Sequence, residues 1–132
     1  LATDSSRIDS VDLTGGGMAY SSRLTGKLNQ RRWFSTGVML PDQSVMVFNG
    51  ADRDGVVLPG LDVATRRAER FDPVIETWKP MATANRMRTY HNTATLMPDG
   101  RVLIGGHAPI TTAYLSAINL QSLGFSPNDG RD

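Results

Sequence analysis

Two adjacent side chains in this sequence could bind a transition metal: Tyr90 and His91. An imidazole nitrogen suits Cu(II), and a phenolate oxygen can act both as a ligand and as a proton acceptor. A tyrosine, whose ordinary pKa is about 10, needs a metal or a neighbouring cation before it loses its proton. Because adjacent residues on a regular strand point to opposite faces, both side chains can reach one metal only where the backbone is irregular. The pair therefore predicts half of a metal site at the start of a strand, just after a loop.

An internal repeat surrounds this pair. Residues 31–50 (RRWFSTGVMLPDQSVMVFNG) align without a gap on residues 88–107 (RTYHNTATLMPDGRVLIGGH), so that Arg88 follows Arg31 by 57 residues. Each copy has a β-prone run, a Pro-Asp turn and a second apolar run, which predicts β-hairpins over 35–48 and 92–104. The continuous apolar runs VMVF and VLI favour strands buried on both faces.

A second pattern recurs between these hairpins. In RAERFDPVIETWKPM (67–81), a short alternating strand meets an Asp-Pro turn, and Trp78 begins the next strand. In DSVDLTGGGMAY (9–20), Val11-Asp12-Leu13 takes the place of Phe71-Asp72-Pro73, and Tyr20 takes the place of Trp78. We therefore expect further strands near 8–13, 67–71 and 78–82.

Four strands within a period of roughly fifty residues are typical of the blades of a kelch-type β-propeller. The sequence predicts an all-β fold, a kelch-type β-propeller fragment of about two and a half four-stranded blades. Residues 1–30 would form the outer strands of one blade and a connection, 31–82 a complete blade, and 83–132 the inner strands of the next blade plus a loop-rich tail, all in one propeller domain. A β-sandwich is the alternative, although it has no reason to repeat at a fixed period. Open sheet flanks would make the isolated chain poorly soluble.

The segment RTYHNTATLMPDGRVLIGG (88–106) resembles the copper-ligand segment of galactose oxidase and the glyoxal oxidases. The resemblance implies that Tyr90 and His91 are copper ligands and that Tyr90 is also catalytic, as the acceptor of the substrate's hydroxyl proton. It further implies that Trp33 and Phe34, at the same place one repeat earlier, line the substrate pocket. Simple packing in the propeller channel is the alternative for these two aromatic residues.

The same resemblance implies parts that this chain does not contain. The redox cofactor of that family is a tyrosine crosslinked to a cysteine, and the chain has no cysteine. A second copper histidine lies in a later domain of those oxidases. The radical group and that histidine would therefore come from the remaining blades and the C-terminal domain of a longer parent chain.

The implied function is part of a secreted or cell-surface copper-radical oxidase, with its signal peptide outside this sequence. Such an enzyme oxidises a primary alcohol or an aldehyde, small or part of a carbohydrate, with O₂ and releases H₂O₂. One alternative is a non-catalytic kelch propeller that binds protein or carbohydrate. Another is an oxidase-like scaffold that has lost its cofactor.

The composition disfavours some classes of binding partner. A net charge of +1 disfavours a dedicated nucleic-acid binder, and no apolar run approaches the ~18 residues of a membrane span. The arginine pairs at 31–32 and 66–67 are expected on solvated surface or in surface salt bridges. The recurrence of Arg31 as Arg88 also favours buried salt bridges between blades over contacts with substrate. His107 is expected to be a loop or surface histidine.

Overall fold

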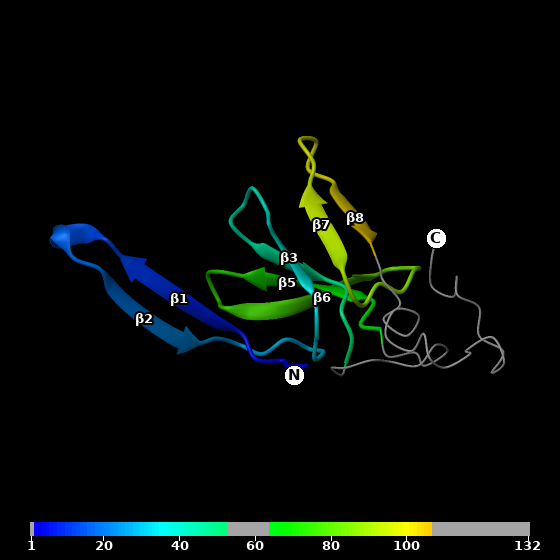
Figure 1. Cartoon of the computed structure of the whole chain (residues 1–132), viewed down its shortest axis with the longest axis horizontal. Helices are drawn as coiled ribbons and strands as arrows, with labels where there is room; N and C mark the ends of the chain where they lie inside the picture. Colours follow the sequence, from blue (N-terminus) through cyan, green and yellow to red (C-terminus); the bar gives the residue numbers. More distant parts are fainter. Residues whose placement is uncertain (1, 53–63, 107–132) are drawn as a thin grey trace, which may run out of the picture.

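The described part of the chain consists of antiparallel strands arranged in three sheets (Figure 1). The computed structural model describes residues 2–52 and 64–106. β1 (Arg7–Asp12) pairs with β2 (Ala19–Leu24), and β7 (Asn92–Leu96) pairs with β8 (Val102–Gly106). Between them, β3 (Thr36–Met39), β4 (Val45–Phe48), β5 (Arg67–Asp72) and β6 (Thr77–Thr83) form one four-stranded sheet in chain order. The prediction of an all-β fold is confirmed for these residues, where a short 3-10 turn at Thr14–Gly16 is the only helical element.

In the same residues, no helix is both long enough and apolar enough to cross a membrane.

The hairpins β3–β4 and β7–β8 have the same turn, as the repeat predicts. In the first, the Leu40 N–H donates to the Ser44 carbonyl at 2.8 Å. In the second, the Met97 N–H donates to the Arg101 carbonyl at 2.7 Å, and these residues lie 57 positions later. The two predicted hairpins are therefore confirmed.

The tip of each turn has a residue with positive φ. It is Gln43 in the first hairpin (φ 68°) and Gly100 in the second (φ 86°). A residue with a Cβ pays about 1–2 kcal/mol in this left-handed region, whereas glycine adopts it freely.

Gln43→Gly should therefore stabilise the protein by up to about 1 kcal/mol, after the entropy that glycine loses on folding is subtracted. Urea unfolding measures the effect. The matched control is Gly100→Ala, which meets no neighbouring atom within 4 Å and should lower stability through backbone strain alone. A lower unfolding midpoint for Gln43→Gly would contradict this account of the turn.

The hairpins β1–β2 and β5–β6 also correspond to each other. Val11 pairs with Tyr20 across the first hairpin, as Phe71 pairs with Trp78 across the second. In both, the aspartate before the turn accepts a backbone N–H at 2.8 Å: Asp12 and Asp72. The equivalence predicted from the sequence is confirmed pair by pair.

The apolar core lies between the four-stranded sheet and the β7–β8 hairpin. Its buried members are Val38, Phe48 and Ala68, and partly buried side chains from β6, β7 and β8 pack against them. Val47 and Phe48 are adjacent, so they occupy opposite faces of β4, and both are buried as predicted. The same prediction is wrong for β8, where Leu103 is 60% exposed because alternation turns it away from the core.

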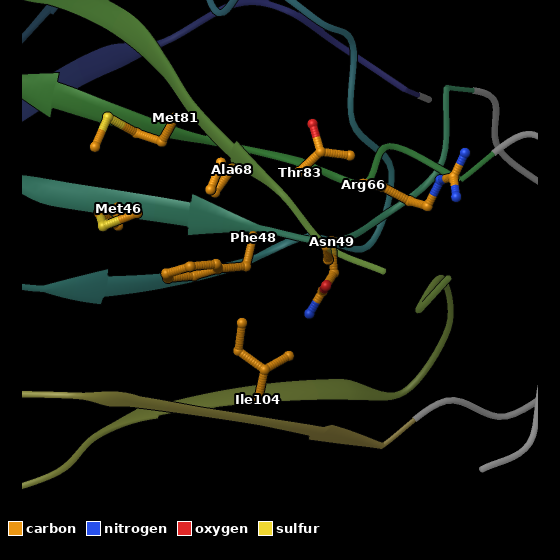
Figure 2. A pocket seen from close by; sticks show the side chains of 10 residues that line it. Met46, Phe48, Asn49, Arg66, Ala68, Met81, Thr83 and Ile104 are labelled. Atoms are coloured by element: carbon orange, nitrogen blue, oxygen red, sulfur yellow. The ribbon is translucent and has the colours of Figure 1, made fainter. Parts of the chain in front are cut away.

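A hollow of about 240 Å³ lies between the four-stranded sheet and Ile104 of β8 (Figure 2). Figure 2 shows Phe48 and Ile104 facing each other across it, with Met46, Ala68 and Met81 along the sheet. These apolar walls are typical of a seam between packed sheets. The hollow is therefore part of the packing, although Asn49, Arg66 and Thr83 also line it.

Candidate functional site

The four residues predicted for the site meet in one cluster of rings. The Trp33 and Tyr90 rings are stacked, with centroids 5.5 Å apart and planes within 6°. The Phe34 ring lies 4.5 Å from that of Tyr90, and the His91 ring lies 3.8 Å from it. His91 also meets Phe34 edge-on at 5.7 Å. The structure thus joins two turns that are 57 residues apart in the sequence.

An irregular backbone permits this arrangement. Phe34 and His91 occupy equivalent positions in the repeat, and both have left-handed φ, 58° and 50°. Bulky residues rarely adopt this conformation, which costs about 1–3 kcal/mol and is found preferentially at functional sites. It interrupts strand alternation, so the Tyr90 and His91 rings stack, with planes 23° apart, and do not point to opposite faces. The irregularity predicted at the start of this strand is confirmed.

A glycine packs against each of the two turns. A Cβ on Gly106, at the end of β8, would lie 2.5 Å from the His91 carbonyl oxygen. A Cβ on Gly50 would lie 2.7 Å from the Trp33 carbonyl oxygen. Both distances are too short for any side chain, so these glycines let the hairpin ends close over the turns.

The donor types of the cluster fit a copper ion in part. Tyr90 offers a phenol oxygen and His91 an imidazole nitrogen, both of which Cu(II) accepts. His91 is exposed and Tyr90 is half-buried, so both rings can be reached from solvent. Within residues 2–52 and 64–106, no three His, Cys, Asp or Glu side chains come together as a metal site. Tyr90 and His91 could therefore supply two ligands of a larger set. His107 lies outside the described residues.

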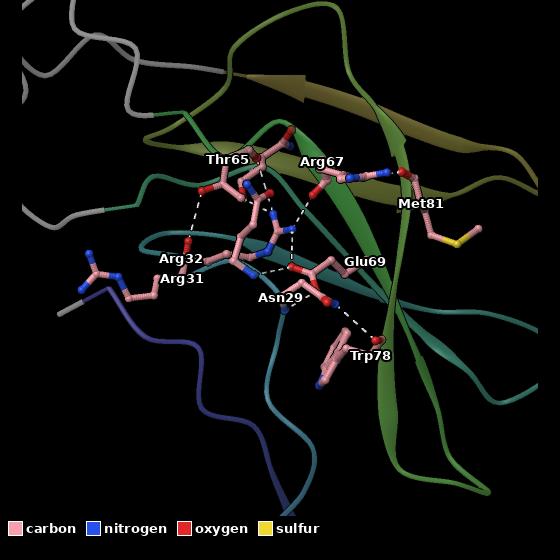
Figure 3. A network of polar contacts seen from close by, with 10 residues as sticks. Asn29, Arg31, Arg32, Thr65, Arg67, Glu69, Trp78 and Met81 are labelled. Atoms are coloured by element: carbon pink, nitrogen blue, oxygen red, sulfur yellow. Dashed lines mark hydrogen bonds and ion pairs between the residues drawn. The ribbon is translucent and has the colours of Figure 1, made fainter.

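The buried ion pair of this region involves Arg32, which corrects two expectations: Arg32 was expected on the surface, and Arg31 in a buried pair. Arg32 is 4% exposed, and its Nη2 lies 3.0 Å from Oε1 of Glu69, which is fully buried. Arg31 is exposed, and Figure 3 shows its side chain pointing away from the network. Since neighbouring residues of an extended segment face opposite ways, only one of the two arginines can point inward. Arg88 donates to the Gly106 carbonyl at 2.7 Å and so braces the end of β8.

Glu69 is held by several donors (Figure 3). Asn29 donates to its Oε2 from the backbone at 2.6 Å and from the side chain at 2.7 Å. Burial raises the pKa of Glu69, but the hydrogen bonds from Asn29 and Arg32 outweigh it and hold that pKa below its usual range. The carboxylate is therefore ionised at neutral pH.

Arg32 also anchors the backbone around the site. Its guanidinium donates to the Asn49 carbonyl at 2.9 Å, to the Thr65 carbonyl at 3.4 Å and to the Arg67 carbonyl. Arg32 directly precedes Trp33, so these bonds fix the point where the chain enters the ring cluster. The sequence does not indicate this role, because Arg32 aligns with Thr89 and the repeat has no second copy of it.

Comparison with known proteins gives partial matches. No family model matches the chain. Aldehyde oxidase GLOX1 of Arabidopsis thaliana is 31% identical over 83 residues, which take in 57% of this chain and 13% of that protein. A WSC domain-containing protein of Arthroderma benhamiae is 40% identical over 74 residues, 53% of this chain and 8% of that protein.

Among solved structures, a fungal alcohol oxidase of the AA5 family, in complex with copper, has a TM-score of 0.69. It is 24% identical and covers 79% of this chain and 21% of its own. The described strands thus share their fold with part of a copper-containing oxidase. The chain is therefore similar in sequence to part of an aldehyde oxidase and in fold to part of a copper-containing alcohol oxidase. It spans no more than 21% of any of these three proteins.

Proposed function

We propose that this chain is a portion of a kelch-type propeller in a secreted copper-radical oxidase. The enzyme oxidises a primary alcohol or an aldehyde with O₂ and releases H₂O₂. Its four-stranded sheet is one blade, and the flanking hairpins belong to the neighbouring blades. The observation that carries the proposal is the stacking of Tyr90 on His91, 3.8 Å apart, at a left-handed turn.

Tyr90 and His91 hold the copper ion in this proposal. The other ligands and the tyrosine–cysteine radical group come from parts of the protein outside this chain. When bound, copper and the radical group together take up two electrons from the substrate and return them to O₂. For an alcohol, the substrate carbon loses a hydrogen and the hydroxyl loses a proton, and both appear in H₂O₂.

The residues of this chain act on the substrate in two ways. The Tyr90 oxygen, as a phenolate, accepts the hydroxyl proton of the substrate. Trp33 and Phe34 cannot ligate copper, since an indole N–H only donates and a phenyl ring has no lone pair. Their rings instead form an apolar wall beside Tyr90, which receives the carbon skeleton of the substrate and excludes water.

The proposal is tested on the full-length protein. Copper content is measured after loading with Cu(II), and H₂O₂ is followed with alcohols and aldehydes of different size. We expect one copper ion per protein and O₂-dependent H₂O₂ formation. A protein that binds no copper would instead be a propeller that recognises protein or carbohydrate.

Trp33→Ala should leave copper bound and change substrate preference. The ring contributes a stacked surface beside Tyr90 but no ligand, so its loss should alter the ratio of kcat/KM between a bulky and a small alcohol by about 10-fold or more. The control is Trp78→Ala, which removes the other tryptophan of the chain. Trp78 contacts Phe71 in the hairpin β5–β6, so its loss should lower stability and leave preference unchanged. Loss of copper in Trp33→Ala would contradict the role as a pocket wall.

A further inference from the structure

The side chain of Asn92 joins the two turns of the ring cluster. Its Nδ2 donates to the Phe34 carbonyl at 2.7 Å and to the Thr89 carbonyl at 2.8 Å. Its Oδ1 accepts from Thr36 Oγ1 at 2.7 Å and from Asn49 Nδ2 at 3.1 Å. A carboxamide has two N–H donors and an oxygen with two lone pairs, and Asn92 uses all of them.

The two carbonyls that Asn92 holds belong to the turns that carry the site. Phe34 is the left-handed residue of the first turn, and Thr89 directly precedes Tyr90 in the second. Such strained turns persist only where surrounding groups fix them. One side chain therefore sets the distance between the Trp33–Phe34 wall and the Tyr90–His91 pair.

Asn92 is also connected to the buried ion pair. Asn49, which donates to Asn92, is 4% exposed, and its carbonyl accepts from Arg32. Arg32 in turn pairs with Glu69. The hydrogen bonds thus run without a gap from the interior of the four-stranded sheet to the residue that follows His91.

This arrangement is specific to the site and not a general property of the repeat. Ser35 occupies the equivalent place 57 residues earlier. A serine side chain has one donor and cannot bridge two carbonyls in the same way. Of the two repeat copies, within the described residues, only the one that carries Tyr90 and His91 therefore has this full set of hydrogen bonds.

We infer that Asn92 is a positioning residue, which fixes Tyr90 and His91 against Trp33 and Phe34 and so sets the geometry of the two copper ligands. The copper part of this inference rests on the proposed function. The positioning of the rings does not, and it can be measured in the copper-free protein.

The test uses Asn92→Ala and Asn92→Asp in the full-length protein. The first removes all four hydrogen bonds, and the second keeps the size and the acceptor but loses both donors. Both should weaken binding of Cu(II) alone by about 10- to 100-fold in a titration and change the EPR spectrum of the bound ion. Both should also reduce the near-UV circular dichroism of the copper-free protein, since the stacked rings lose their fixed orientation.

The matched control is Asn29→Ala, which removes an asparagine side chain bonded to Glu69 at the far end of the network. It should lower stability while leaving the EPR spectrum and the near-UV signal as in the wild type. If Asn92→Ala does not fold, Thr36→Val removes the hydroxyl that donates to the side-chain oxygen and backbone carbonyl of Asn92, and should cause a smaller change in the same direction.

Wild-type EPR and near-UV spectra in both Asn92 variants would overturn the inference while leaving the proposed function intact. If the wild-type protein binds no copper, the proposed function fails. The near-UV signal then decides alone whether Asn92 positions the rings.

Discussion

His91→Ala is expected to bring the copper content of the full-length protein close to zero and to abolish H₂O₂ formation. The imidazole is the only nitrogen ligand that the described residues place beside the Tyr90 ring, and alanine has no donor atom. Loss of a residue that only supports a metal ligand typically weakens metal binding by about 10- to 100-fold. Loss of a direct ligand should weaken copper binding by at least this factor. Copper is measured by atomic absorption and H₂O₂ by a coupled peroxidase assay.

The control for this substitution is His107→Ala, which removes the other histidine of the chain. It should leave copper content and H₂O₂ formation unchanged. Full oxidase activity in His91→Ala would show that the copper ligands lie elsewhere and would overturn the role assigned to His91, while the oxidase proposal itself would stand.

Arg32→Met is expected to destabilise the protein by about 3–5 kcal/mol, because it leaves the fully buried Glu69 carboxylate without its ion-pair partner. Methionine fills much of the same volume, so the change is mainly electrostatic. Chemical denaturation measures it. As a control, Arg101→Ala removes an arginine with an 81% exposed side chain from the pair with Asp99 and should change little. An equally small effect for Arg32→Met would contradict the role assigned to the buried pair.

The same pair predicts how stability depends on pH. The pKa of Glu69 is lower in the folded protein than in the unfolded chain. The ionised carboxylate therefore contributes its full share to the free energy of unfolding at pH values above the unfolded pKa of about 4.3. The contribution is then lost as pH falls through the lower, folded pKa. In Glu69→Gln this part of the acid dependence should be absent, and an unchanged acid profile would show that Glu69 does not cause it.

The sequence predicted the fold well where the residue types have a strong preference for one backbone conformation, as in turns and strands. The Pro-Asp turns, the apolar runs and the 57-residue offset located the hairpins β3–β4 and β7–β8, and the recurrence of Asp and an aromatic residue located β1–β2 and β5–β6. Three pairs of residues at this offset also share positive φ: Phe34 with His91, Gln43 with Gly100, and Asn49 with Gly106. Among these six residues, the two glycines are the type that most directly indicates a positive φ from the sequence.

The four ring residues of the candidate site were named from the sequence and lie together in the structure, but the residues that support them were not foreseen. Tyr90 and His91 are visible because their side chains have a distinctive chemistry. Arg32 is not, since its neighbour Arg31 is chemically identical and only the folded chain decides which one is buried. The sequence does not point to Asn92, because three of its four partners lie 43 to 58 residues away and approach it only in the folded protein.

The shared left-handed turn has a consequence for how such a protein diversifies. Phe34 and His91 sit on the same backbone geometry, yet one side chain is a hydrocarbon and the other a nitrogen base. After tandem duplication of such a unit, the geometry is inherited with the backbone, and a single codon change at this position can exchange an apolar surface for a Lewis base. A new ligand can thus arise at a backbone position that the fold already provides, while the strands around it stay unchanged.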